Sequence, residues 1–83
     1  MMSEEDLDIF EPPLEESQYA LMQCERRTGI VLTTKGNQFT GWGDVFWFFD
    51  YLKAARDFAS RKQSEDIECN IYDSNYEHVE TIY

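Results

Sequence analysis

One amphipathic helix pattern, flanked on both sides by strand-like patterns, is the feature that most constrains the fold of this chain. Residues 51–63 place apolar side chains at helical spacing on one side and charged side chains on the other. The apolar positions are Tyr51, Leu52, Ala54, Ala55, Phe58 and Ala59. With 83 residues the chain forms at most one domain, so we expect this helix to bury its apolar side against strands.

The stretch before the helix predicts a hairpin and a further strand. Residues 18–27 alternate between two faces, and residues 30–34 are rich in β-branched side chains, which strands prefer. The turn residues 28–29 lie between them, so an antiparallel hairpin is predicted. A second turn at 36–37 leads to a third strand that begins near Gln38.

The aromatic-rich stretch that follows fits two interpretations. In the first, a strand is bent by a bulge at Gly41 or Gly43, and residues 45–49 are buried on both faces. In the second, a helix begins with Asp44 as its N-cap. We favour the strand, because consecutive aromatic and β-branched residues suit a strand and Asp50 is itself a suitable N-cap for the helix.

After the helix, residues 67–72 alternate between apolar and polar side chains and predict a strand. A turn at 73–75 leads to a short last strand over 76–83, whose weak apolar pattern indicates an edge position. The predicted fold is α+β: a small, mainly antiparallel sheet in β-β-β-α-β-β order, with one helix packed on one face.

Acidic residues gather at both ends of the chain. Residues 1–17 hold seven acids and no base, residues 64–83 hold six acids and no base, and the stretch between them holds seven bases against four acids. Dense acid and two consecutive prolines predict that residues 1–17 form a flexible arm. Residues 18–83 then form the single α+β domain.

The formal net charge of -10 opposes direct binding of nucleic acid and of anionic membranes. No apolar run approaches the roughly 20 residues of a membrane helix. The first residues lack the basic and apolar regions of a signal peptide, so we expect a cytoplasmic protein.

The sequence offers little for catalysis. Cys24 and Cys69 fall on inward faces of predicted strands and are expected to be buried as small hydrophobic residues. They could pair only if their Cα atoms lay within about 6 Å. Together with His78 they lack the close spacing of a zinc site. Since no nucleophile-and-base arrangement or phosphate loop is evident either, we predict no enzyme, no metal and no cofactor.

An apolar cluster formed by Leu7, Ile9 and Phe10 lies within the acidic arm. The segment 6–10 resembles the Gln-Leu-Asp-Leu-Phe type of motif that docks into the bacterial sliding clamp, although Asp6 stands where that motif has Gln. The resemblance implies an adaptor that recruits a partner through this motif. The alternative is that these side chains fold back onto the core of this protein.

Aromatic residues exceed what one helix on one sheet can bury, since the chain has two Trp, five Tyr and six Phe. Two interpretations are equally open for Trp42, Tyr72 and Tyr76. Either they pack in the core, or they lie on an uncovered sheet face, where aromatic side chains anchor partners or pair two subunits into a homodimer.

The charge pattern predicts a small acidic inhibitor that engages a basic face of another protein. In the most concrete version its carboxylates stand in for phosphates, as a DNA mimic, in the groove of a nuclease or another nucleic-acid-binding enzyme. The predicted charged row is Glu65, Asp66, Glu68, Asp73, Glu77 and Glu80. Phage-encoded inhibitors of host enzymes and bacterial immunity proteins resemble it in size and charge. A weaker alternative is nucleic-acid binding by Arg26, Arg27 and Lys35, which the surrounding acid opposes.

Overall fold

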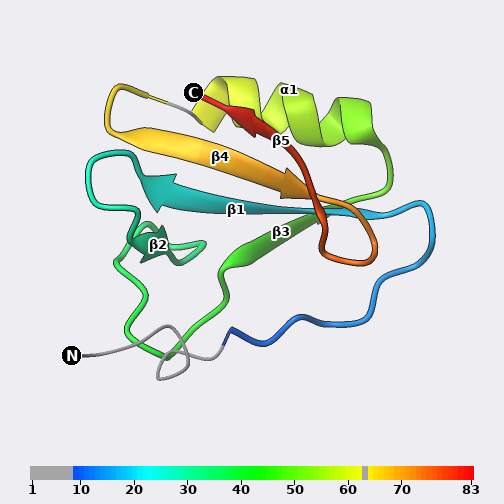
Figure 1. The fold of residues 1–83 in the computed structure, drawn as a ribbon, viewed down its shortest axis with the longest axis horizontal. Helices are drawn as coiled ribbons and strands as arrows, with labels where there is room; N and C mark the ends of the chain where they lie inside the picture. Colours follow the sequence, from blue (N-terminus) through cyan, green and yellow to red (C-terminus); the bar gives the residue numbers. More distant parts are fainter. Residues whose placement is uncertain (1–8, 63) are drawn as a thin grey trace.

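The computed structural model describes residues 9–62 and 64–83, which form a five-stranded sheet and one helix (Figure 1). The elements in chain order are β1 (Tyr19–Glu25), β2 (Val31–Leu32), β3 (Phe46–Phe49), α1 (Leu52–Lys62), β4 (Ile67–Tyr72) and β5 (His78–Ile82). The predicted α+β class and the β-β-β-α-β-β order are confirmed. Within the described residues, no helix has the length and apolarity that crossing a bilayer requires.

Strand β1 organises the sheet. Along one edge it pairs antiparallel with β4, and along the other it pairs first with β3 and then with β2. Strand β5 pairs with the outer edge of β4 through an irregularity between Ile71 and Tyr72, so it is the edge strand that its weak apolar pattern predicted.

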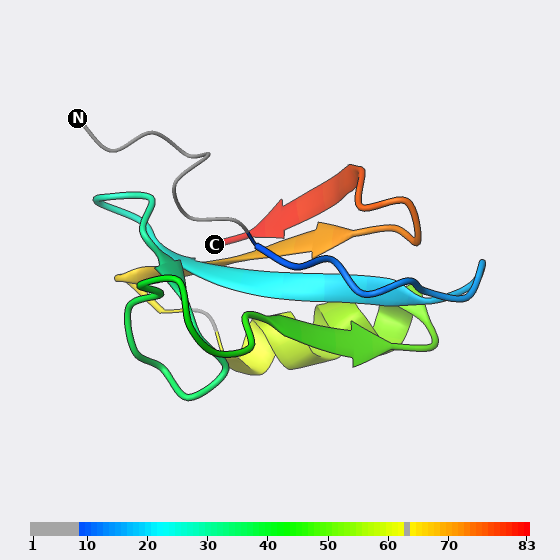
Figure 2. The ribbon, with the colours of Figure 1, turned by 90° about the horizontal axis from the view of Figure 1, so that it is seen from below.

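Helix α1 lies along one side of the sheet (Figure 2). The first core cluster joins Ala55 and Ala59 of the helix to buried side chains of β1 and β4, namely Leu21, Cys69 and Ile71. These positions confirm the helical period. Tyr51, however, is 72% exposed, because α1 begins one residue later, at Leu52. Tyr51 contributes to the helix through its backbone carbonyl, which accepts a hydrogen bond from the Ala55 N–H.

One ion pair lies on α1 itself. Asp57 pairs with Lys53, one turn before it, at 3.0 Å. Both partners are largely exposed, so this pair adds little to stability.

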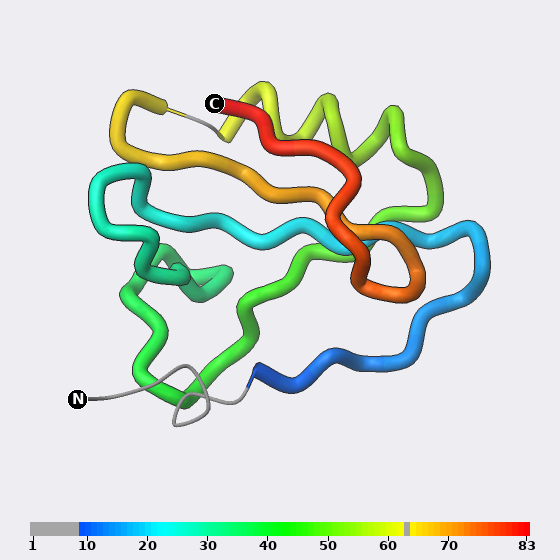
Figure 3. Tube along the Cα trace, viewed as in Figure 1, coloured from blue at the N-terminus to red at the C-terminus, as the bar shows by residue number. Residues whose placement is uncertain are grey.

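The opposite face of the sheet, expected to be uncovered, is partly covered. Its second core cluster contains Ala20, Phe39, Val45 and Phe46. The segment before β1 runs beside β3 (Figures 1 and 3), and its side chains Ile9 and Leu14 pack against this cluster. The folding-back alternative is therefore confirmed for Ile9.

The aromatic-rich stretch before the helix forms strand β3, so the strand interpretation is confirmed and the helix starting at Asp44 is wrong. The strand begins later than predicted, because Gly41 and Gly43 hold positive φ angles of 103° and 96° that interrupt an extended chain. Gln38 forms only an isolated bridge with Leu32. Burial on both faces is wrong for Phe48, which is 44% exposed.

Candidate protein-binding surface

The acids of the predicted row are distributed along β4 and do not form one line. Glu65 and Asp66 lie in the loop before β4, and Asp73 and Glu77 lie in the turn after it. Six residues of strand span roughly 20 Å, so these two groups lie at opposite ends of β4. Glu68 lies between them, on the strand itself.

Glu80 is separated from Glu68 by the sheet. The register places Glu80 opposite Ile71 and Glu68 opposite Cys24, and these positions point to opposite faces. On the helix side, the Oε1 atom of Glu80 lies 2.7 Å from the Nε atom of Arg56. Its charge is therefore compensated within the protein.

Tyr72 marks a concentration of negative charge on the face opposite the helix. Burial raises the pKa of its phenol, and electrostatic contributions from Cys24, Glu11 and Glu68 raise it further. Glu11, from the segment before β1, thus acts on the same side chain as Glu68 of β4. Sequence patterns alone gave no indication of Glu11, because its position depends on how its segment packs on the sheet.

Tyr76 lies beside this charge. Its ring centre is 5.2 Å from that of Phe46, and its hydroxyl donates a 2.6 Å hydrogen bond to the Pro12 carbonyl. A small hollow of about 100 Å³ opens at this point. Its lining is Ile9, Glu11, Met22, Phe46, Tyr72 and Tyr76.

The turn between β4 and β5 fixes the neighbouring acids. The Asp73 carboxylate accepts hydrogen bonds from the backbone N–H groups of Asn75 and Glu77, at 2.8 and 3.0 Å. Asp73 therefore has a structural role, whereas the Glu77 side chain is exposed. We call the following set the acidic-aromatic surface: Glu11, Glu68, Tyr72, Asp73, Tyr76 and Glu77.

Basic residues concentrate on the other side of the sheet. Four of the seven lie on α1, namely Lys53, Arg56, Arg61 and Lys62. Among the described residues two ion pairs form, Lys53 with Asp57 and Arg56 with Glu80, and neither includes a member of the acidic-aromatic surface. The sheet thus separates a helix rich in bases from a face rich in carboxylates.

Trp42, the third predicted aromatic anchor, is not part of this surface. It is 83% exposed on the loop before β3 and lines a separate polar hollow of about 330 Å³. The sequence hypothesis therefore grouped aromatic residues that the fold places in two different regions.

The two cysteines are free and buried, as expected of small hydrophobic residues. Cys24 pairs in register with Glu68, and Cys69 pairs with Gln23, so the two thiols point to opposite faces of the sheet. Burial is the main cause that raises the pKa of both thiols. Among residues 9–62 and 64–83, no group of three potential ligands is placed to hold a metal ion.

The predicted linear motif is divided by the fold. Ile9 packs on the second core cluster, while Phe10 is 77% exposed. Asp6 and Leu7 lie outside the described residues. Comparisons of this chain with protein-family models, curated proteins and solved structures give no match.

Proposed function

We propose that this protein is a small acidic binding protein whose acidic-aromatic surface engages a basic face of another protein. The observation that carries the proposal is the separation of charge across the sheet, with bases on α1 and carboxylates around Tyr72. Such a separated field orients a basic partner during encounter and increases the association rate.

The aromatic side chains supply the second half of a binding surface. Tyr72 and Tyr76 are only partly buried, and tyrosine is enriched among residues that contribute most to interface affinity. A partner that covers them would exclude water from the contact and strengthen the charge pairs at Glu11 and Glu68.

Inhibition by competition is the most concrete form of this proposal. In this form the binding surface also includes Glu65 and Asp66 in the loop before β4. They lie roughly 20 Å from the acids after the strand, a distance close to the rise of six phosphates along one DNA strand. Carboxylates at this spacing can occupy the site of a nucleic-acid backbone on a nuclease or another nucleic-acid-binding enzyme. The proposal places the protein in the cytoplasm, where free thiols such as Cys24 stay reduced.

Charge reversal tests the surface directly. Glu68→Lys and Glu77→Lys, singly and together, should weaken binding to a partner captured from the native host, whereas Asp57→Lys on α1 makes the same charge change on the other side. Asp73 is left unchanged because its carboxylate holds the turn. Binding of labelled nucleic acid by the captured partner should fall as the wild-type protein is added.

Salt provides the second measurement. Because salt screens exposed charges, wild-type affinity should fall steeply as ionic strength rises, and the doubly reversed variant should respond less. Equal partner binding by wild type, Glu68→Lys and Asp57→Lys would contradict the proposal. Affinity that does not change with salt would contradict the phosphate-mimicking form in particular.

An adaptor function is the second candidate, and the 77% exposure of Phe10 favours it. In that case Phe10→Ala together with Leu7→Ala removes partner binding, while Glu68→Lys leaves it unchanged. The inhibitor hypothesis predicts the reverse order of effects. The two variants therefore separate the hypotheses within the same 83-residue chain.

A further inference from the structure

The small hollow beside Tyr76 is lined by aromatic side chains from three parts of the chain. Phe46 comes from β3, Tyr72 from β4 and Tyr76 from the turn after β4. The Phe46 ring centre lies 6.3 Å from that of Tyr72 and 5.2 Å from that of Tyr76, with interplanar angles of 89° and 57°. Because both tyrosine rings are steeply inclined to the Phe46 ring, neither stacks on it, and each ring contributes its own part of the lining.

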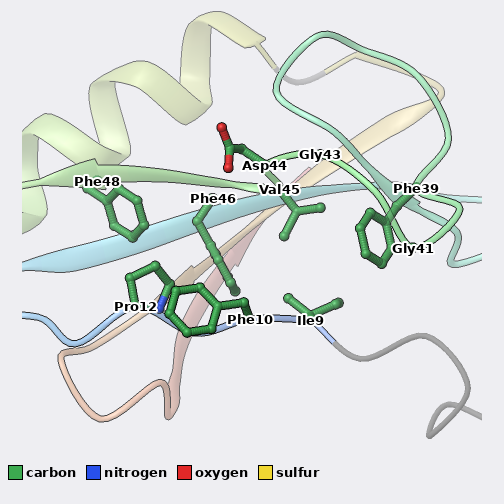
Figure 4. A pocket seen from close by; sticks show the side chains of 10 residues that line it. All are labelled: Ile9, Phe10, Pro12, Phe39, Gly41, Gly43, Asp44, Val45, Phe46 and Phe48. Atoms are coloured by element: carbon green, nitrogen blue, oxygen red, sulfur yellow. The ribbon is translucent and has the colours of Figure 1, made fainter.

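The segment before β1 contributes the acidic part of the lining. Its residues Ile9 and Glu11 line the hollow, and the Tyr76 hydroxyl donates a 2.6 Å hydrogen bond to the Pro12 carbonyl of the same segment. Figure 4 draws the neighbouring apolar hollow, which Ile9 and Phe46 also line, and shows the Phe46 side chain extending from β3 toward this segment. A site held in place before binding loses little conformational entropy when a ligand arrives.

Charge identifies the kind of ligand. Among the described residues that line the hollow beside Tyr76, Glu11 is the only one with a charge, and it is exposed and belongs to neither of the two ion pairs. Burial is the main cause that raises the pKa of Tyr72 and of Tyr76, and the negative charge of Glu11 adds to both. The Glu11 carboxylate therefore lies near both rings, and the hollow favours a cation.

Aromatic rings and size favour an ammonium group as this cation. The faces of aromatic rings attract cations, and sites that recognise alkylammonium groups place several rings around a small space. The volume of about 100 Å³ equals that of about three molecules of liquid water, which suits a compact ammonium group. A guanidinium is planar, stacks flat on one ring and pairs best with both oxygens of a carboxylate. Rings that are inclined to one another match the ammonium better.

We infer that this hollow is an aromatic cage that receives the ammonium end of one lysine side chain of the partner protein, with Glu11 as its counter-ion. The rings of the cage are Phe46, Tyr72 and Tyr76. The inference rests on the proposed function, because it names the residue type by which a basic partner enters the acidic-aromatic surface. It assigns anchoring to the rings and orientation of the partner to the surrounding carboxylates.

Peptide titration of the ¹⁵N-labelled protein at constant ionic strength tests the inference. The probe is acetyl-Gly-Lys-Gly-amide, and its matched control has norleucine, which keeps the four-carbon chain and lacks the ammonium group. The lysine peptide should shift the amide signals of Tyr76 and Glu77. Its ε-methylene protons should move upfield, because they lie over ring faces. The norleucine peptide should bind about fivefold more weakly, and a third peptide with arginine should also bind more weakly than the lysine peptide.

Paired variants separate a cage from a purely structural role of the same residues. Tyr72→Leu removes one ring and should weaken the lysine peptide several-fold, whereas Tyr72→Phe restores the ring and should recover most of the binding. Glu11→Gln removes the counter-ion at an exposed position and should also weaken binding several-fold. Glu16→Gln, an exposed acid outside the lining, is its matched control. The amide spectrum of each variant reports whether the fold is kept.

The outcomes distinguish this inference from the proposed function. Equal affinity for the lysine peptide and either of the other two peptides would overturn the cage. Absence of the upfield shift, or unchanged affinity in Glu11→Gln, would also overturn it. Each of these results leaves the proposed function standing. Failure of the proposed function is read separately, from partner binding that Glu68→Lys leaves unchanged.

Discussion

The Tyr76 hydroxyl donates a 2.6 Å hydrogen bond to the Pro12 carbonyl, which is 64 residues away in sequence. This bond joins the turn after β4 to the segment before β1, and so joins two parts of the acidic-aromatic surface. Tyr76 also holds a positive φ of 61°, a conformation that a bulky residue rarely adopts. Its placement therefore depends on the surrounding contacts.

Removing this hydroxyl should destabilise the fold modestly. Tyr76→Phe keeps the ring against Phe46 but loses the bond to Pro12, so we expect a cost of about 0.5–1.5 kcal/mol in the free energy of unfolding. Urea unfolding followed by circular dichroism measures it. Tyr51→Phe, at a 72% exposed position, is the control and should change little. Equal stability of Tyr76→Phe and wild type would mean that the bond contributes nothing.

Alkaline pH should destabilise the protein. Burial raises the pKa of Tyr72 and Tyr76, so the folded state holds these protons more tightly than the unfolded chain. Their contribution to folding stability is complete below the ordinary tyrosine pKa of about 10. It is lost as the pH rises through the raised pKa values of the folded state. Burial also raises the pKa of the Cys24 and Cys69 thiols. Their ionisation therefore lowers the stability of the folded state in the same way, from about pH 9 upward.

The measurement is the free energy of unfolding at a series of pH values from neutral to strongly alkaline. A Tyr72→Phe, Tyr76→Phe double variant should lose stability less steeply above about pH 10, because the two titrating groups are absent. If wild type and double variant have the same slope there, the raised tyrosine pKa values do not contribute.

Shortening a buried side chain at the centre of the sheet should destabilise the fold strongly. Leu21, on β1, is fully buried between the sheet and α1, so Leu21→Ala should cost about 2–5 kcal/mol through lost burial and the remaining cavity. Thermal unfolding by circular dichroism measures the change. Val79→Ala, at a 40% exposed position, is the control. Because Leu21→Ala could leave the chain unfolded, Leu21→Val offers a milder truncation, which should still destabilise more than the control.

The ion pair of Arg56 and Glu80 should contribute little, although it is short. Both side chains are partly exposed to solvent, and such pairs are worth at most about 1 kcal/mol. A double-mutant cycle with Arg56→Gln and Glu80→Gln measures the coupling. Because Glu80 lies on the helix side, Glu80→Gln should also leave partner binding unchanged. If Glu80→Gln strongly weakened partner binding, Glu80 would belong to the binding surface, as the predicted charged row proposed.

The periodic spacing of apolar residues within each segment was sufficient to predict which elements form. The helical spacing around Ala55 and Ala59 predicted α1, and the two-residue alternation of 67–72 predicted β4. Such patterns lie within one segment and follow from the geometry of its own backbone. The start of β3 at Phe46 was missed, because positive φ at Gly41 and Gly43 depends on the loop that contains them.

The sequence by itself determined the number, type and order of the elements and the separation of acidic ends from a basic centre. Only the tertiary structure decided that Glu11 and Glu68 both act on Tyr72, that Glu80 pairs with Arg56, and that the two cysteines point to opposite faces of the sheet. The physical reason is strand register, since a shift of one residue between β1 and β4 moves every side chain to the other face. That register is set by the packing of all segments together.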